Sequence, residues 1–283
     1  MALTVNTNTT SLNVQKNLNR ASDSLSTSMT RLSSGLKINS AKDDAAGLQI
    51  ATRMTSQIRG QTMAIKNAND GISIAQTAEG AMQESTNILQ RMRELAVQSR
   101  NDSNGTADRA ALNKEFASMS DELTRIAKST NLNGKNLIDG TAGTMTFQVG
   151  SNTGATNQIT LTLDSGFDAA TLSVDSATVQ ITGNNSATAE ASMNNALTKI
   201  DAALAKINSS RADLGAAQNR LTSTISNLQN INENASAALG RVQDTDFAAE
   251  TAQLTKQQTL QQASTAILAQ ANQLPSAVLK LLQ

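Results

Sequence analysis

The chain has 283 residues, enough for one or two domains, and it contains no Cys, His, Trp or Tyr and only four Phe. Aromatic side chains supply much of the bulk of a globular core, so this composition favours long, thin helices packed through Leu, Ile, Met and Ala. The lack of Cys and His removes the commonest nucleophiles, bases and metal ligands, and argues against an enzyme and against a cofactor. The 23 basic and 23 acidic residues balance, which favours neither nucleic acid nor a membrane surface as a partner.

The first 36 residues begin with a polar stretch and then become periodic. Apolar residues recur every three or four positions, which predicts an amphipathic helix through Val14, Leu18, Ala21, Leu25, Met29, Leu32 and Leu36. Ser, Thr and Asn fill the opposite face, so this helix is expected to be marginal alone and to order against a partner. The N-terminus lacks a basic start followed by an apolar run, so no secretory signal peptide is expected. No run of about 18 apolar residues exists, so no membrane-spanning helix is predicted either.

Ser40 and Asp43 have the spacing of a capping box that would start the next helix. From residue 45 to about residue 99, apolar residues alternate in steps of three and four, which is heptad spacing. Gly60, Gly71 and Gly80 interrupt this helix, and they would allow either close approach or curvature. After an Asn- and Gly-rich loop, a third helix is predicted over residues 106–129.

The middle of the chain differs in composition from the predicted helices. Gly residues interrupt it, and Thr alternates with β-branched residues. Residues 145–149, 158–163 and 177–182 are predicted to form short strands. A second heptad seam then runs from Met193 to Leu239 in a helix beginning near residue 187, and it is interrupted by Arg211 and Gln218.

A last amphipathic helix is predicted between Asp246 and the C-terminus. Its apolar residues are Ile267, Ala271, Leu274, Val278 and Leu281. Because a helical stripe needs a partner that covers it, the two terminal segments are expected to pair, as are the inner helices. The prediction is a mainly α fold, a long antiparallel helical bundle or coiled coil with a small β region in the middle of the chain.

Several long motifs then identify a resemblance to a known family. Residues 32–47 (LSSGLKINSAKDDAAG) and 89–98 (LQRMRELAVQ) resemble the N-terminal region of bacterial flagellins. Residues 211–220 (RADLGAAQNR), 242–250 (VQDTDFAAE) and 268–275 (LAQANQLP) resemble the flagellin C-terminal region. These motifs occur in order at both ends of the chain and leave only residues from about 150 to 190 outside the resemblance.

The resemblance implies a structural protein that is exported through the flagellar type III channel and polymerises into the extracellular filament used for swimming. Residues 1–44 and 241–283 would form the coiled coil of the filament core. Residues 45–240 would form the surrounding tube, with helices over 45–130 and 187–240 and a β-hairpin within 131–186. Larger flagellins insert outer domains in the middle, so this chain looks like a short form. The implied partners are further copies of the chain, an export chaperone, and the filament cap and hook–filament junction proteins.

The same resemblance points to one surface patch. From pattern alone this patch is a solvated helix face, but in flagellins the matching segment packs between subunits and is also recognised by a Toll-like receptor. The positions that carry over are Gln90, Arg91, Glu94 and Leu95, with Glu115 on the next helix.

A second implied site consists of the apolar residues of the terminal helices. They would make core assembly contacts, and at the C-terminal end they would contact the export chaperone and cytosolic innate receptors. These residues are Leu18, Leu25, Leu32, Ile267, Leu274, Val278, Leu281 and Leu282.

Other candidate sites have simpler explanations. Asp43 and Asp44 have the form of a carboxylate pair, but helix capping explains them better. Asp164, Asp168 and Asp175 lie in a loop-rich stretch that lacks an EF-hand pattern, so they are expected to be solvated loop acids and not a calcium site.

Two alternatives remain beside the filament subunit. A hook–filament junction protein shares the terminal coiled coils, but the long motifs at both ends and the small middle argue against it. A secreted enzyme of coiled-coil shape would need site residues that the sequence lacks. Removing residues 1–30 or 250–283 and following seeded polymerisation by electron microscopy separates these functions, because filaments that still grow normally would contradict the filament-subunit model.

Overall fold

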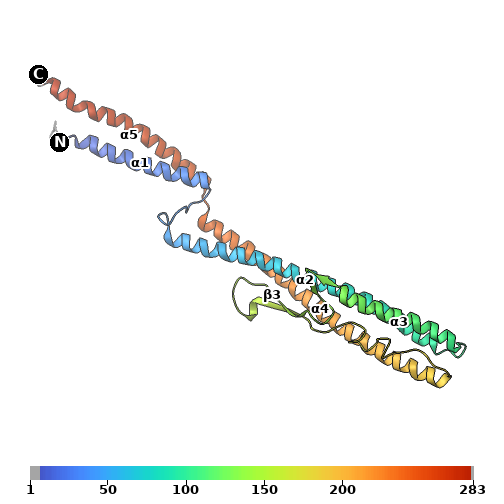
Figure 1. Cartoon of the computed structure of the whole chain (residues 1–283). Coiled ribbons are helices and arrows are strands. Elements are labelled where there is room, and N and C mark those ends of the chain that lie inside the picture. Colours follow the sequence, from blue (N-terminus) through green and yellow to red (C-terminus); the bar gives the residue numbers. More distant parts are fainter. Residues whose placement is uncertain (1–6, 282–283) are drawn as a thin grey trace. The chain divides into compact units, whose positions relative to one another are not determined.

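The computed structural model describes the backbone of residues 7–281 and the side chains of residues 7–273. Its long helices are α1 (Thr9–Ser34), α2 (Ala45–Ser99), α3 (Thr106–Ser129), α4 (Ser186–Gln243) and α5 (Phe247–Leu281), drawn in Figure 1. The short elements are β1 (Asn131–Leu132), β2 (Lys135–Asn136), β3 (Gly143–Gln148), the 3₁₀ turn η1 (Ala155–Asn157) and β4 (Gln158–Leu163). The predicted mainly α fold is therefore confirmed. Within residues 7–281, no helix combines the length and the apolar character needed to cross a bilayer.

The chain divides into two compact units, one made of residues 1–58 and 233–283 and the other of residues 59–232. Helices α2 and α4 contribute to both units because each runs past a unit limit. The limits predicted from the resemblance, at 44/45 and 240/241, stay a prediction.

The unit of residues 59–232 contains the apolar core. The heptad seam of α4 faces inward as predicted, because Ile200, Ile207, Leu214 and Leu221 are almost inaccessible to solvent. Helix α2 contributes small and flexible side chains to the same core, and α3 contributes its predicted stripe through Phe116 and Leu123. The α2 positions of this core are Ala75, Ala78, Met82, Leu89, Met92, Leu95 and Ala96.

Strands β3 and β4 form an antiparallel hairpin whose register runs from Gly143–Leu163 to Gln148–Gln158. Alternate residues of β4 are buried against the helices, namely Ile159, Leu161 and Leu163. This confirms the two strands predicted over 145–149 and 158–163, although the first one begins two residues earlier.

The third predicted strand, residues 177–182, is wrong. Val179 and Ile181 are buried, but the backbone N–H of Ile181 donates to Oδ1 of Asn113 on α3 at 2.9 Å, and the segment pairs with no described strand. The alternation of apolar residues therefore reports burial against helices in an irregular segment. Aspartate turns shape this part of the chain, since Asp168 accepts from Thr171 and Asp175 accepts from Thr178.

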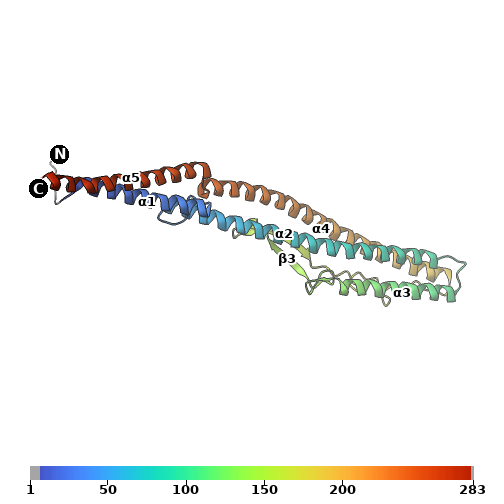
Figure 2. The same ribbon diagram turned by 90° about the horizontal axis from the view of Figure 1, so that it is seen from above.

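In the other unit, α1 and α5 lie side by side and run antiparallel (Figures 1 and 2). Asn8 caps α1 through its side chain, which accepts from the backbone N–H of Ser11 at 3.0 Å. Gly35 ends α1 with φ 74°, a left-handed conformation that suits glycine.

The segments next to α1 and α5 are joined by backbone hydrogen bonds. Lys37 N–H donates to the Gln243 carbonyl at 2.7 Å, and Thr245 N–H donates to the Gly35 carbonyl at 3.0 Å. These two bonds lie on either side of a bridge between residues 36 and 244. They fix the start of the α1–α5 pair.

The α1–α5 seam is much less apolar than the core of the other unit. Its most buried side chains are Ala21, Ser28, Gln257 and Ala271, and the predicted leucines Leu18, Leu25 and Leu32 are only half-buried. Helix α5 faces α1 through a heptad row that is partly polar, consisting of Glu250, Leu254, Gln257, Gln261, Ser264, Leu268 and Ala271.

Large apolar residues consequently lie on the outside of this pair. They are Leu12 and Met29 on α1 and Phe247, Leu260 and Ile267 on α5, with exposed fractions between 44 and 58%. Met29 and Ile267 were both predicted on the inward stripes, and that placement is wrong. The reason is that a stripe with steps of three and four is wider than the narrow seam between two helices, so one of its edges stays outside.

Candidate functional site

The predicted surface patch lies on α2 and is organised by one guanidinium group. Arg91 Nη2 and Nε donate to Oε1 of Glu115 on α3 at 2.8 and 3.2 Å, and Nη1 donates to Oε2 of Glu94 at 3.0 Å. The hydrogen bonds to Glu115 and then Glu94 raise the pKa of Arg91 above its already high ordinary value. Arg91 is therefore charged at any physiological pH, and it links α2 to α3 at the surface.

The structure brings together four of the five predicted patch residues. Gln90, Arg91 and Glu94 are exposed on α2, and the Glu115 side chain is 42% exposed. Leu95 differs, because its side chain is fully buried in the core. Leu95 therefore supports the patch from below and shares no surface with the other four.

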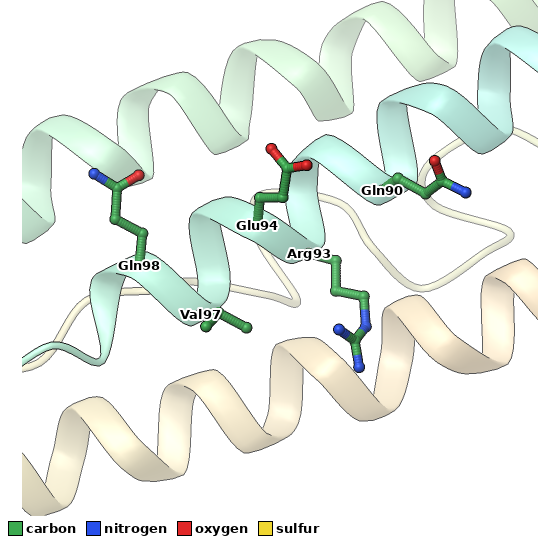
Figure 3. Close-up of a pocket in the computed structure, with 5 residues that line it drawn as sticks. All are labelled: Gln90, Arg93, Glu94, Val97 and Gln98. Atoms are coloured by element: carbon green, nitrogen blue, oxygen red, sulfur yellow. The ribbon is translucent and has the colours of Figure 1, made fainter.

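An open groove of about 570 Å³ lies beside this patch on α2 (Figure 3). Its lining consists of Gln90, Arg93, Glu94, Val97 and Gln98. In Figure 3, Glu94 and Gln98 point toward the side of α3, whereas Arg93 and Val97 point toward α4. Val97 is 49% exposed and gives the groove an apolar centre.

Sequence reasoning placed Arg93 in the charged patch without a contact role, and it missed Val97, Gln98 and Asp201 as parts of this surface. Arg93 Nε donates to Oδ1 of Asp201 on α4 at 3.1 Å, so the groove is flanked by one ion pair to α3 and another to α4. Val97 and Gln98 belong to the recognised motif 89–98 and could have been included on that ground. Asp201 carries no local signal, because its position depends on how α4 packs against α2.

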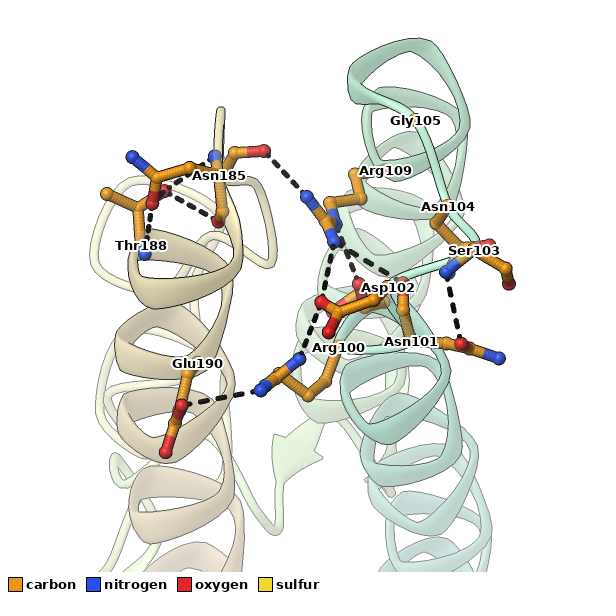
Figure 4. Close-up of polar contacts among 12 residues, drawn as sticks. Arg100, Asn101, Asp102, Ser103, Asn104, Gly105, Arg109, Asn185, Thr188 and Glu190 are labelled. Carbon is orange, nitrogen blue, oxygen red and sulfur yellow. Dashed lines mark hydrogen bonds and ion pairs between the residues drawn. The ribbon is translucent and has the colours of Figure 1, made fainter.

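A second polar cluster joins the loop after α2 to the segment before α4 (Figure 4). The buried Arg109 donates through Nε to the Ser99 carbonyl at 2.9 Å, and through Nη1 and Nη2 to the carbonyls of Gly183 and Asn101. Because each acceptor belongs to the backbone, this side chain terminates α2 and anchors the chain where it enters α4. Sequence reasoning missed Arg109 altogether.

Arg100 extends this cluster at the surface. Its Nη1 pairs with Asp102 at 2.9 Å, and its Nη2 pairs with Glu190 on α4 at 3.4 Å. The cluster is a structural tie between chain segments, with no reacting group among its members.

The two polar residues that interrupt the α4 seam, Gln218 and Arg211, both contact one acidic residue of α2. Gln218 Nε2 donates to Oε2 of Glu79 on α2 at 2.9 Å, and Arg211 Nη2 lies 3.9 Å from Oε1 of the same carboxylate. A single acidic residue on α2 therefore contacts both polar residues of the seam, and polar contacts of this kind can set the register of packed helices. The Nε of Arg211 is buried without an acceptor in the described part of the chain.

The acidic pair before α2 has a capping role, with one change from the prediction. Asp44 caps the helix, because its Oδ1 accepts from Gly47 N–H at 2.9 Å. Asp43 instead closes the preceding turn by accepting from Ser40 N–H and Asn39 N–H. Those bonds, led by the one from Ser40, lower the pKa of Asp43. The predicted capping box at 40–43 is thus a turn, and the cap of α2 is Asp44, four residues after the predicted cap Ser40.

The carboxylates of the loop residues Asp164, Asp168 and Asp175 are not gathered around one site. Asp168 and Asp175 each accept hydrogen bonds from a threonine three residues later, and Asp164 lies next to Ser165. Within the described residues, no group of three or more Asp, Glu, His or Cys is placed to hold a metal ion.

The predicted terminal contact residues are only partly described. Leu18, Leu25 and Leu32 are half-buried along α1, and Ile267 is exposed on α5. Leu274, Val278 and Leu281 belong to α5, but their side chains lie outside the described set, and Leu282 lies outside the described residues.

Comparison with known proteins now gives the chain a family. Residues 5–143 match the family model for the bacterial flagellin N-terminal helical region, and residues 197–282 match the one for the C-terminal helical region. The chain is 41% identical to polar flagellin A of Vibrio parahaemolyticus and 40% identical to flagellin B of Vibrio anguillarum, with all of both chains covered. Both alignments extend over 375 positions, so these relatives contain residues that this 283-residue chain lacks.

A solved structure from Vibrio parahaemolyticus, assigned as a flagellar hook-associated protein, covers 71% of this chain and 100% of its own. Its TM-score is 0.60 at 14% identity, which shows a shared fold and no more. The two family models and the full-length relatives carry the assignment. The chain belongs to the bacterial flagellins, non-enzymatic structural proteins that form the extracellular filament of the flagellum.

Proposed function

We propose that this subunit assembles by coupled folding of its two terminal helices against those of neighbouring copies. The observation that carries the proposal is the pair α1–α5, which has a half-polar seam inside and large apolar side chains outside. Such a pair stabilises itself weakly, because two helices cover only one narrow face of each other. Neighbouring copies are the natural cover, since flagellins polymerise.

The energetic case rests on the outward residues. Leu12, Met29, Phe247, Leu260 and Ile267 are each about half exposed, and full burial of such a side chain contributes about 1.5–3 kcal/mol relative to exposure. Several partial burials per subunit would offset the cost of ordering two helices. Assembly and ordering would therefore occur together at the growing end of the filament.

The first test is deletion. Chains that lack residues 1–30 or 250–283 should keep the fold of residues 59–232 but fail to elongate wild-type filament seeds, as judged by electron microscopy. Normal growth of either truncated chain would refute the assembly mechanism.

A second test uses point substitutions on the outer face of α5. Leu260→Asp or Ile267→Asp should reduce seeded elongation at least tenfold while the circular dichroism of the monomer stays unchanged. Gln262→Asp is the matched control, because it adds the same charge at an exposed polar position of the same helix. Equal elongation by the leucine variant and its control would show that this face is not covered in the filament.

The domain division predicted from the resemblance belongs to this proposal. Residues 1–44 with 241–283 would form the filament core, and residues 45–240 would form the surrounding tube. The contrast between the polar α1–α5 seam and the apolar core of residues 59–232 supports it. A filament reconstruction that placed α1 or α5 on the outer surface would contradict it.

The proposed route to the filament includes an export chaperone on the C-terminal helix, around Leu274, Val278, Leu281 and Leu282. A chain with apolar, weakly paired ends needs cover before export, because such segments aggregate. Purified chaperone should bind the full chain and lose binding when residues 274–283 are removed. Retained binding would move the chaperone site elsewhere.

The α2 patch is proposed to contact neighbouring subunits and, in the free monomer, a host flagellin-sensing Toll-like receptor. The exposed side chains of Gln90, Arg91, Glu94 and Glu115, together with the adjoining groove, support this role. Leu95 would act from the core by holding α2 in place. Arg91→Ala monomers should signal more weakly than wild type in receptor reporter cells, whereas undiminished signalling would count against the receptor role.

A further inference from the structure

Among the residues whose side chains are described, one ion pair joins helices α1 and α5. Arg31 Nη1 lies 3.6 Å from Oε2 of Glu250, and the two side chains are 29% and 14% exposed. Of the charged residues of α1 and α5 whose side chains are described, these two alone face the seam. Lys16, Arg20, Asp23 and Lys256 are all exposed.

Few of the other side chains in the seam distinguish one register of α1 against α5 from another. Both helices repeat with heptad spacing, and the inward positions are mostly small or uncharged, as at Ala21, Ser28, Gln257 and Ala271. A slip of one heptad would bring Gln257 to the place of Glu250 and leave Arg31 facing an amide. In coiled coils, a single polar or charged contact at the seam is the usual device that selects register and partner.

Two further polar contacts hold the same antiparallel register at the far end of the pair. Asn8 Nδ2 donates to the Ala271 carbonyl at 2.7 Å, and Ser11 Oγ donates to Oδ1 of Asn272 at 2.8 Å. Both are contacts between uncharged groups, and they lie where slipped helices could form similar hydrogen bonds with other Asn, Ser or Gln side chains. Backbone hydrogen bonds between Lys37 and Gln243 and between Thr245 and Gly35 also hold this register at the start of the pair. Among the side-chain contacts of the two helices, the charge pair is therefore the one that discriminates most strongly between registers.

Because of the environment of Arg31, loss of the Glu250 carboxylate is expected to destabilise the α1–α5 pair. Its Nε is buried and has no acceptor in the described part of the chain, and Glu250 is the carboxylate of α5 that lies next to this guanidinium. Arg31 also interacts electrostatically with Asp43, which precedes α2. Removing the carboxylate would leave a half-buried cation facing the row of uncharged α5 side chains.

We propose that the Arg31–Glu250 pair is a specificity-determining contact, which sets the register in which α1 packs against α5 of the same chain. The proposal rests on the assembly mechanism above, because a filament can be regular only if every subunit pairs its ends identically. Subunits paired in a shifted register would present the outer apolar residues at displaced positions and would stop growth.

The test begins with charge reversal. Arg31→Glu and Glu250→Arg should each reduce seeded elongation at least tenfold, and the double variant should return to within about threefold of wild type. Arg31→Lys keeps the charge and should elongate well. The matched controls Lys16→Glu and Lys256→Glu reverse exposed charges on the same two helices and should behave like wild type.

A cysteine pair reports the register directly, because the natural chain has no cysteine. Ser11→Cys with Asn272→Cys places thiols on two side chains that are hydrogen-bonded to each other. Oxidation should give an intrachain disulfide in the otherwise wild-type chain, much less in the Arg31→Glu background, and a restored yield in the double charge reversal.

Mixing the two single variants separates pairing within a chain from pairing between chains. If the pair forms only within one chain, an equimolar mixture of Arg31→Glu and Glu250→Arg subunits should elongate as poorly as either alone. Elongation of the mixture at the level of the double variant would overturn the assignment to one chain. A double variant that failed to recover while wild type elongated would overturn the proposal entirely. If wild-type chains did not elongate, the assembly mechanism would be wrong, and the disulfide yields would still decide the register.

Discussion

The two units use the same heptad spacing but differ in how completely they bury their large apolar side chains. In residues 59–232, the seams of α2, α3 and α4 meet around bulky side chains such as Phe116, Phe167 and Met82, which are fully buried. In the α1–α5 pair, the most buried positions are Ala21, Ser28, Gln257 and Ala271, and the large apolar residues face outward. Periodicity therefore shows that a helix is amphipathic, whereas the number of elements that surround it decides whether its apolar face is covered.

The difference has a functional consequence. A unit that buries its own core can fold once, before or after export, and keep its shape. A pair with a half-polar seam depends on further contacts, and this dependence suits a polymer whose subunits must stay apart until they reach the growing end. The following predictions test this contrast between the two units, in order from the largest expected effect to the smallest.

The contrast is tested most strongly by removing one large side chain from each unit. Phe116→Ala should destabilise residues 59–232 by about 3–5 kcal/mol, because it deletes a fully buried ring. Leu25→Ala, at a half-buried position of α1, should cost at most about 1 kcal/mol in the monomer. Urea unfolding followed by circular dichroism measures both. Equal losses would show that the α1–α5 seam is as well packed as the core.

The buried guanidinium is the next largest contributor to the unit of residues 59–232. Arg109→Met should cost about 3 kcal/mol, because the carbonyls of Ser99, Asn101 and Gly183 lose a charged donor. Limited proteolysis should then cut more readily in the loop of residues 100–105. Arg125→Met is the matched control, since this exposed arginine pairs only with Glu122 one turn away on α3. A loss confined to the control would contradict the role of Arg109.

Two glycines of α2 sharpen the comparison within a single helix. A Cβ at Gly71 would lie 3.2 Å from Leu221 Cδ1 and 3.3 Å from Phe147 Cγ, so Gly71→Ala should destabilise by about 1–2 kcal/mol through overpacking. A Cβ at Gly80 meets nothing within 4 Å, so Gly80→Ala should stabilise the helix by about 1 kcal/mol. The midpoints of urea unfolding should shift in opposite directions. Of the two structural effects predicted for these glycines, close approach and curvature, close approach therefore applies to Gly71.

The smallest expected effect concerns pH and the irregular segment before α4. The hydrogen bond from Thr178 Oγ1, helped by two backbone N–H groups, lowers the pKa of Asp175 below 3.8. Its stabilising contribution is therefore complete above about pH 3.8 and is lost as the pH falls through the lower folded-state pKa. Asp175→Asn should cost about 0.5–1 kcal/mol at neutral pH and make acid unfolding less steep. Asp70→Asn, at an exposed position of α2, should leave the acid unfolding curve unchanged.

Much of the fold could be read from spacing alone. Residues 45–99 and 106–129 are helical over the predicted ranges, and the strands of the hairpin differ from prediction by no more than two residues. These elements are predictable because capping, loop composition and apolar period are local properties. The prediction of a strand at 177–182 is wrong because the alternation of apolar residues shows which side chains are buried. It does not show which groups form hydrogen bonds with the backbone.

The candidate site was predictable only in part. The motif at 89–98 located the exposed patch, and the structure added Asp201, which lies more than 100 residues away on α4. Leu95 was assigned to the surface because it belongs to the same motif, but adjacent positions on a helix point in different directions. Arg109 gave no signal, since an arginine in the first turn of a helix is normally solvated.

By itself, the sequence determined that this protein is built from amphipathic helices, where those helices begin and end, and which family it belongs to. The tertiary structure decided which part of each wide apolar stripe is covered, and this depends on how many neighbours surround a helix. Helices α2 and α3 and the hairpin bury the seam of α4, whereas α1 and α5 cover each other on one narrow face. The outward residues Met29, Leu260 and Ile267 follow from that geometry and not from the spacing of residues along the chain.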